Sequence, residues 1–152
     1  MKAGKRLTAA TAASVLVTAA VVVLAQNVPL KLMQVVPGDL KFRPMPNGTL
    51  QAAVVGDSTK PGLYAIRTKL PAGLHLQPHF HPDERIVTVL AGTLYVGFGE
   101  KFDTSTMRPL PPGGVFTEPA RQPHFTWAKD GEVLLHIVGN GPTGTTEILK
   151  GR

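Results

Sequence analysis

Short apolar or alternating runs, each closed by Gly or Pro, follow one another from residue 50 onward. Alternation with a period of two residues indicates strands with one buried face, and short apolar runs between turn residues also indicate strands. The runs predict strands at 50–56, 62–70, 85–92, 92–99, 113–119, 124–129 and 131–139. Within them, LAGTL at 90–94 predicts a tight hairpin corner. After residue 26 no stretch keeps an apolar stripe at helical spacing, so an all-β fold is predicted.

Two segments interrupt this pattern. Residues 26–49 hold several prolines and the turn signal Asn47-Gly48, which forbid a long helix and predict an irregular arm leading into an edge strand. The polar stretch 99–114 predicts a loop or a short helical turn. Regularly spaced strands with Gly and Pro corners indicate a sandwich or barrel, and double-sheet jelly rolls are one such architecture. We therefore predict one β-barrel domain over 50–152, without internal repeats.

The first 25 residues have a different character. Lys2, Lys5 and Arg6 precede an uncharged, apolar stretch at 7–25, which predicts a signal peptide cleaved after Ala25. The alternative is an uncleaved anchor, because nineteen residues of helix reach about 28 Å, close to the thickness of the hydrocarbon core. Both interpretations predict export to a bacterial periplasm or secretion, with membrane contact only through this segment.

Composition narrows the function classes. A length of 152 residues fits one domain, and 16 Gly with 14 Pro suits short strands and tight turns. The absence of cysteine excludes disulfides and thiolate metal sites. Without the predicted signal, 13 Lys and Arg face 10 Asp and Glu, so the net charge falls from +6 to +3. These basic residues are scattered, and no nucleic-acid partner is predicted.

The stretch HFHPDER at 79–85 carries the candidate chemistry. His79 and His81 are two residues apart, so on a strand they point to the same face. An inward-facing pair in a small barrel is a chelate for Zn, Fe, Mn, Ni or Cu, since imidazole suits all of these metals. The alternative is a surface pair on a proline-rich loop.

Two patterns in the chain are similar to the motifs of the cupin superfamily. The first cupin motif, G-x5-H-x-H-x(3,4)-E-x6-G, is matched at Gly73, His79, His81 and Gly92. The second, G-x5-P-x-G-x2-H-x3-N, is matched at Gly113, Pro119 and His124, whereas Arg121 replaces its internal Gly and Ala128 its final Asn. The resemblance covers residues 50–148 and points to small, exported, single-domain cupins.

This resemblance implies a double-stranded β-helix, or jelly-roll barrel. It also implies that His79, His81 and His124 are ligands of one divalent transition metal (Fe, Mn, Zn, Ni or Cu). A small-molecule ligand or substrate would then bind at the barrel mouth, and two copies would pair as a homodimer, for which the strand near 50–56 is a candidate edge.

The glutamate of the first motif is displaced. Counting back six residues from Gly92 gives Arg85, and Glu84 precedes it. Our preferred hypothesis is a bulge near Pro82 that turns Glu84 inward as a fourth ligand. The alternative is a regular strand in which Arg85 points inward and holds an anionic ligand. Asp83 is a weaker candidate ligand, and Glu118 is another carboxylate that could approach the centre.

His136 lies in the apolar run VLLHIV and is either a core residue or an inward-facing group that contacts substrate. With Arg85 it completes the candidate catalytic set. The histidine cluster is compatible with an oxygenase- or isomerase-like, metal-dependent enzyme acting on a small molecule. A non-catalytic module that binds a metal or a small molecule is the alternative, and a structural barrel with vestigial histidines is the third hypothesis. A shared fold does not decide among them.

Overall fold

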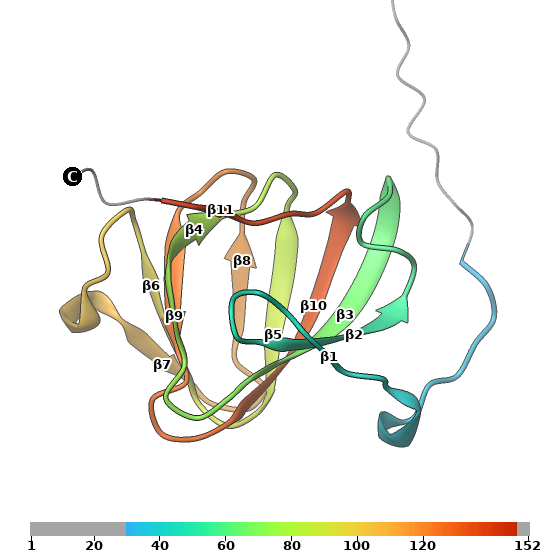
Figure 1. Ribbon diagram of the computed structural model, residues 1–152, viewed down its shortest axis with the longest axis horizontal. Coiled ribbons are helices and arrows are strands. Elements are labelled where there is room, and N and C mark those ends of the chain that lie inside the picture. Colours follow the sequence, from blue (N-terminus) through green and yellow to red (C-terminus); the bar gives the residue numbers. More distant parts are fainter. Residues whose placement is uncertain (1–29, 149–152) are drawn as a thin grey trace, which may run out of the picture.

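A computed structural model describes residues 30–148, and Figure 1 shows them as a barrel of two facing sheets. The strands are β1 (Arg43–Pro44), β2 (Leu50–Val55), β3 (Gly62–Leu70), β4 (His75–Phe80), β5 (Arg85–Ala91), β6 (Leu94–Phe98), β7 (Arg108–Leu110), β8 (Val115–Glu118), β9 (His124–Trp127), β10 (Val133–Gly141) and β11 (Thr146–Glu147). Two short 3-10 helices are η1 (Pro37–Asp39) and η2 (Thr104–Thr106). Between residues 30 and 148 no helix has the length and apolar character to cross a membrane. The predicted signal segment lies outside the described residues.

The strands form two antiparallel sheets. One has the order β1-β2-β3-β10-β5-β8, and the other has the order β11-β4-β9-β6-β7. This arrangement confirms the predicted all-β, jelly-roll class. All seven predicted strands are present within a few residues of their expected bounds, and β1 is an edge strand after the arm, as expected there. The pattern did not predict β4, β7 and β11. In the predicted loop at 99–114 the chain forms both η2 and β7.

The expected hairpin at 90–94 is not formed, because β5 and β6 belong to different sheets. The chain instead crosses from one sheet to the other at Gly92. This residue has φ +74°, and a Cβ on it would lie 2.3 Å from the carbonyl oxygen of Glu132. Only glycine meets both conditions without strain, so the motif glycine marks a corner of the barrel rather than a hairpin turn.

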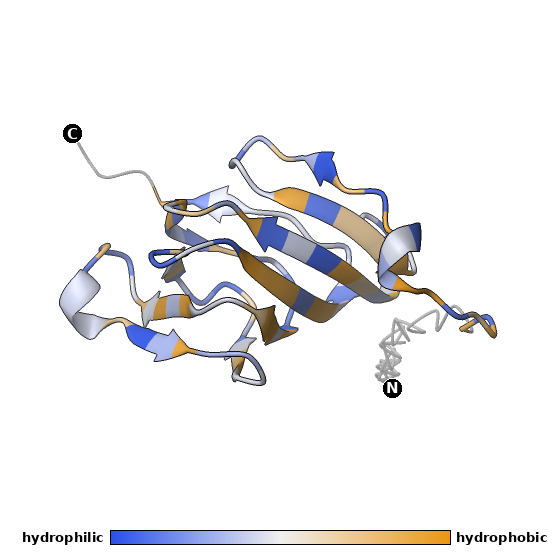
Figure 2. Ribbon diagram, turned by 90° about the horizontal axis from the view of Figure 1, so that it is seen from below, coloured by the Kyte–Doolittle hydropathy of each residue, from blue (hydrophilic) through white to orange (hydrophobic). Residues whose placement is uncertain are grey.

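The core lies between the sheets. It is made by inward-facing apolar residues of both: Tyr64, Ile66, Leu70, Val87, Val89, Leu94, Val96, Phe116, Ala128, Val133, Leu135 and Ile137. Figure 2 shows the alternation behind this core, since hydrophobic and hydrophilic colours alternate along several strands. Burial of one such Val, Leu or Ile side chain contributes roughly 1.5–3 kcal/mol. The packed core therefore fixes which residues at the strand ends face inward.

Polar residues replace apolar ones at one end of this interior. β4 and β8 end there, and β5 and β9 begin there, as their positions in Figure 1 show. The segment leading to β11 crosses the same end, because Thr146 and Glu147 pair with Phe80 and His79 of β4. This end of the barrel holds the candidate site.

Candidate metal centre

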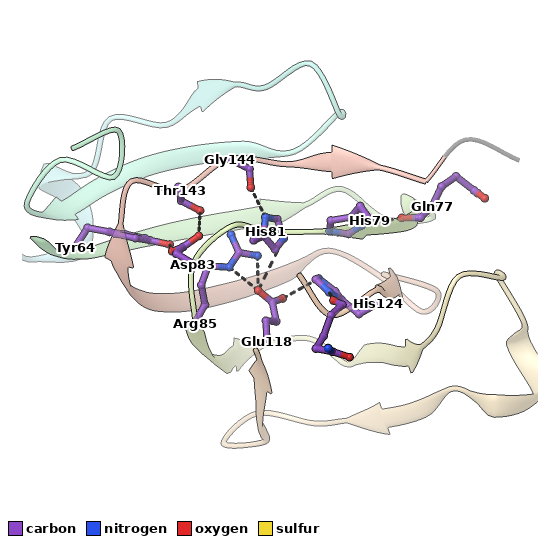
Figure 3. A network of polar contacts seen from close by, with 11 residues as sticks. Tyr64, Gln77, His79, His81, Asp83, Arg85, Glu118, His124, Thr143 and Gly144 are labelled. Carbon is purple, nitrogen blue, oxygen red and sulfur yellow. Dashed lines mark hydrogen bonds and ion pairs between the residues drawn. The ribbon is translucent and has the colours of Figure 1, made fainter. Parts of the chain in front are cut away.

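Three histidines from two distant parts of the chain meet inside the barrel (Figure 3). His79 in β4 lies directly opposite His124 in β9, and His81 follows two residues after His79. All three are buried, and each offers a ring nitrogen that lies within 4.8 Å of the other two. The ring centroids are 4.4 Å apart for His79 and His124, and 5.0 Å apart for His79 and His81. The structure thus brings together the three residues that the motifs single out.

The chain fixes the orientation of each imidazole. The Nδ1 atom of His79 lies 2.7 Å from the carbonyl oxygen of Gln77, and that of His81 lies 2.5 Å from the carbonyl oxygen of Gly144. The Nδ1 atom of His124 lies 3.2 Å from the carbonyl oxygen of Gln122. A carbonyl only accepts, so each Nδ1 is the donor and Nε2 is left to face the interior. Partners of this kind hold the tautomer and the ring direction of metal-binding histidines.

The protonation state of the cluster also suits a metal. Burial lowers the pKa of His79 from 6.5 to about 4, and the neighbouring His124 contributes in the same direction. Burial likewise lowers the pKa of His81 to about 3, with a further contribution from the positive charge of Arg85. Both rings are therefore neutral near pH 7. A neutral imidazole offers the lone pair that a metal ion needs, and no proton has to be displaced from it.

A small cavity of about 50 Å³ lies at the centre of the cluster. Three buried polar atoms around it have no hydrogen-bond partner: Nε2 of His81, Oγ1 of Thr68 and Oγ1 of Thr126. Unpartnered buried polar atoms are costly and rare in native proteins. The volume is sufficient for an ion with a water molecule, which requires roughly 10–15 Å³ each. The imidazole donors and the cavity therefore fit a divalent transition metal, which binds nitrogen ligands well.

A larger cavity of about 470 Å³ forms the mouth of the barrel. It shares Asn47, Gln51, Arg85 and Thr145 with the lining of the small cavity, so the two adjoin. Its other lining residues are of mixed polarity and come from the turns at 45–47 and 58–59, from Ile66 in β3 and from the segment at 143–147. The mouth is large enough for a small organic molecule, which typically needs a cleft of roughly 300–1,000 Å³.

The position of the displaced glutamate is resolved by the burial pattern. β4 ends at Phe80 and β5 begins at Arg85, and the chain between them bends at Pro82 and Asp83. From His81 to Val89, buried residues alternate with more exposed ones through this bend. Glu84 is consequently exposed, and Arg85 is buried with 8% of its surface accessible. The preferred hypothesis of an inward Glu84 is therefore corrected. Arg85 begins β5 in the facing sheet and lines the same cavity as the histidines, so it points inward as the alternative hypothesis expected, although a bend and not a regular strand leads to it.

Glu118 accompanies Arg85 in the interior. The two residues are direct partners across β5 and β8, and Nε of Arg85 donates to Oε2 of Glu118 at 2.5 Å. A second guanidinium nitrogen, Nη2, contacts the same oxygen. Burial alone would raise the pKa of Glu118, but the contact with His124 and the charge of Arg85 outweigh it and lower the pKa to about 2. Arg85 is thus neutralised by a carboxylate of the protein.

A second buried network, which the sequence did not reveal, holds the end of the barrel together. Oδ2 of Asp83 accepts a hydrogen bond from the hydroxyl of Tyr64 at 2.7 Å, and Oδ1 accepts one from Thr143 at 2.6 Å. Figure 3 shows this network beside His81. It fastens the segment after β10 to the loop that carries the metal-ligand candidates. Asp83 has both oxygens engaged and is therefore a structural residue here.

His136 lies on the other side of the sheet. In β10 the inward residues are Leu135 and Ile137, which line the small cavity, so His136 between them points outward. Its Nδ1 contacts the guanidinium of Arg67, the residue directly opposite it on β3. The hypothesis that His136 faces the candidate centre is therefore corrected. β10 is apolar on both faces, so its pattern did not reveal which face is inward.

Arg121 has the backbone conformation that the motif glycine would have. Its φ is +62°, in the left-handed region, and it is the one non-glycine residue of the described chain found there. Its backbone N–H donates to the carbonyl of His81 at 2.7 Å. The turn between β8 and β9 is thereby linked to a ligand candidate, although the sequence departs from the motif.

Comparisons with known proteins agree with this geometry. No protein-family model matches the sequence, and no curated protein matches it significantly. Among solved structures, a polyketide cyclase, RemF from Streptomyces resistomycificus, has a TM-score of 0.64 at 16% identity over 80% of this chain and 89% of its own. An RmlC-like cupin from Shewanella frigidimarina has a TM-score of 0.59 at 14% identity over 74% and 94%. An oxalate oxidase in complex with the substrate analogue glycolate has a TM-score of 0.52 at 22% identity over 68% and 57%.

These likenesses define the fold of the chain. The chain has the cupin fold, as its two motifs predicted, and its histidine cluster lies where those motifs meet.

Proposed function

We propose that this chain binds one divalent transition metal through His79, His81 and His124 and acts on a small molecule as an oxygenase- or isomerase-like enzyme. The observation that carries the proposal is the convergence of three Nε2 atoms, each oriented through Nδ1 by a backbone carbonyl, on a cavity with unpartnered polar atoms. A metal bound there supplies a Lewis acid, or a redox centre if it is iron, manganese or copper.

The protein itself holds the ligand candidates in position and keeps bulk water away from them. The ligand candidates are at least nine-tenths buried, and the small cavity adjoins the mouth through the shared residues Asn47, Gln51 and Thr145. A substrate entering through the mouth would meet these polar groups before it reached the cluster. Solved proteins with this fold include a polyketide cyclase and an oxalate oxidase, both of which act on small molecules.

The experiment has two parts. Elemental analysis of the protein, purified without a histidine tag, should give close to one transition-metal ion per chain. Turnover and oxygen uptake are then measured with a panel of enols, phenols and small carboxylic acids. Metal-dependent conversion of at least one substrate class supports an enzyme, whereas protein that acquires no metal after incubation with Fe, Mn, Zn, Ni or Cu would contradict the proposal.

The second candidate is a non-catalytic module that binds a metal or a small molecule. It is favoured by the outward position of His136, which removes the general base expected inside the barrel. One tightly held, redox-inert ion without turnover of any panel member would favour this module over the enzyme.

Export and pairing of two copies are also part of the proposal. Expression of the full chain in a bacterium should yield a periplasmic protein whose first residue is Gln26, and a chain that keeps residues 1–25 in the membrane fraction would indicate the anchor instead. Sedimentation of the purified protein would distinguish a homodimer from a monomer.

A further inference from the structure

Glu118 lies against two of the three histidines. Its Oε1 is 3.1 Å from Nε2 of His124, and its Oε2 is 3.9 Å from Nε2 of His81. These are the nitrogens that face the small cavity. Two atoms that bind one transition-metal ion at about 2.0–2.2 Å are separated by about 3 to 4 Å. Oε1 is therefore already at the spacing of a ligand that shares an ion with His124, and Oε2, which Arg85 also binds, is at that spacing from His81.

The register of the sheet explains how a carboxylate came to this place. Arg85 occupies the position where the first motif has its glutamate, and Glu118 is its direct partner on the neighbouring strand β8. Directly opposite residues of an antiparallel pair point to the same face. The inward carboxylate is thus present, but on β8 instead of β5, and an arginine stands in its former position.

The charge of Glu118 allows an arginine to lie close to the candidate metal centre. A guanidinium beside a dication is repelled unless an anion lies between them. Figure 3 shows Glu118 between Arg85 and His124, with Arg85 on the side of Oε2. Oε1 is directed at His124. One carboxylate oxygen therefore faces Arg85, and the other is directed toward the cluster.

The two neighbouring carboxylates, Asp83 and Glu84, are not placed to bind a metal at this centre. Asp83 is engaged by Tyr64 and Thr143, and Glu84 is exposed just before β5 begins. We propose that Glu118 is the fourth ligand of the metal centre, so that a three-histidine, one-carboxylate site is rebuilt with its carboxylate on the adjacent strand. This inference rests on the proposed function, because it presupposes that the histidines bind a metal.

The test uses Co²⁺, whose affinity is measured by competition with a chromophoric chelator and whose visible absorption reports the ligand set. Glu118→Gln should weaken Co²⁺ binding by about tenfold or more and change the absorption spectrum. Glu84→Gln is the matched control, because it alters the adjacent, exposed carboxylate, and it should bind Co²⁺ as the unaltered protein does. Equal affinity and equal spectra for the two variants would overturn the inference.

A double variant separates ligation from simple neutralisation of Arg85. In Arg85→Gln with Glu118→Gln both charges are removed, so recovery of the lost affinity would mean that Glu118 only offsets Arg85, and would overturn the inference. We expect the double variant to stay weak. The exchange Arg85→Glu with Glu118→Arg returns the carboxylate to position 85 and should restore binding to within a few-fold.

The exchange variant also decides the matter if Glu118→Gln fails to fold, because it keeps both charges in the interior. Loss of Co²⁺ binding in a folded exchange variant would count against the inference. Single alanine variants of the three histidines distinguish its failure from that of the proposed function. If they keep their metal, the centre itself is refuted; if they lose it while Glu118→Gln keeps full affinity, only the fourth ligand is refuted.

Discussion

Arg85 and Glu118 face each other across β5 and β8 inside the barrel, with 8% and 5% of their surfaces accessible. Removal of one partner from a buried ion pair leaves an uncompensated charge, which typically costs about 3 to 5 kcal/mol. Arg85→Met should therefore lower the free energy of unfolding by about that amount. Arg85→Met combined with Glu118→Leu should cost far less, because no buried charge remains. Urea unfolding in the presence of a chelator measures both, and a single variant as stable as the unaltered protein would contradict the prediction.

The neutral histidines make the metal-free protein sensitive to acid. The pKa of His79 falls from 6.5 to about 4 and that of His81 falls to about 3 on folding. Below pH 6.5 the unfolded chain therefore binds more protons than the folded one, and stability decreases until the pH reaches the folded pKa values. The loss amounts to about 2 kcal/mol for each histidine between about pH 6.5 and pH 5.

Chelator-treated protein, unfolded in urea at about pH 7 and about pH 5, measures this effect. His79→Gln and His81→Gln should each remove roughly half of the pH dependence. Glu118 does not interfere, since its pKa is lowered from 4.5 to about 2 and its stabilising contribution is lost only as the pH falls through that lower range. A pH-independent stability over this interval would contradict the prediction, because it would mean that the two rings bind as many protons in the folded state as in the unfolded chain.

The metal content of four alanine variants tests which histidines belong to the centre. His79→Ala, His81→Ala and His124→Ala should each bind well below one ion per chain after dialysis, because each removes a converging Nε2. His136→Ala is the matched control and should keep the full metal content, since His136 contacts Arg67 on the outer face of the sheet. Loss of metal in His136→Ala, with the fold intact by circular dichroism, would contradict the assignment.

The left-handed backbone at Arg121 predicts an unusual response to glycine. A residue with a Cβ pays about 1–2 kcal/mol in this region, whereas glycine does not. Arg121→Gly should therefore be more stable than Arg121→Ala by about 1 kcal/mol, because both lose the side chain and only alanine keeps the strain. Thermal unfolding of the two variants compares them directly, and a less stable glycine variant would show that flexibility gained in the unfolded chain outweighs the strain.

The sequence predicted the fold and the histidine cluster well. The fold follows from the alternation of apolar and polar residues, and the cluster follows from the spacing of residues within two motifs. Alternation predicted the strands, and the pleat alone places His79 and His81 on one face. Their meeting with His124 followed from the resemblance of two motifs to those of the cupins, and the pairing of β4 with β9 agrees with it.

The remaining parts of the site depend on register between strands, which a single sequence does not display. Glu118 shares its face with Phe116, and this alternation was a usable signal, but only the partner strand shows that it meets Arg85. The choice between Glu84 and Arg85 failed for a different reason: the chain does bend at Pro82, but the bend leads to the facing sheet and leaves Glu84 exposed and Arg85 buried. For His136 no local signal existed, because its strand is apolar on both faces.

The hydrogen bond from His81 to Gly144 joins residues that are 63 positions apart. During synthesis the ring of His81 lacks this partner until residue 144 has emerged and its segment has docked on the barrel. His81 is thus synthesised early, but its ring reaches its final orientation late. Ion capture should consequently report that the final stage of folding has been reached, and chains interrupted before residue 144 should be unable to retain the ion.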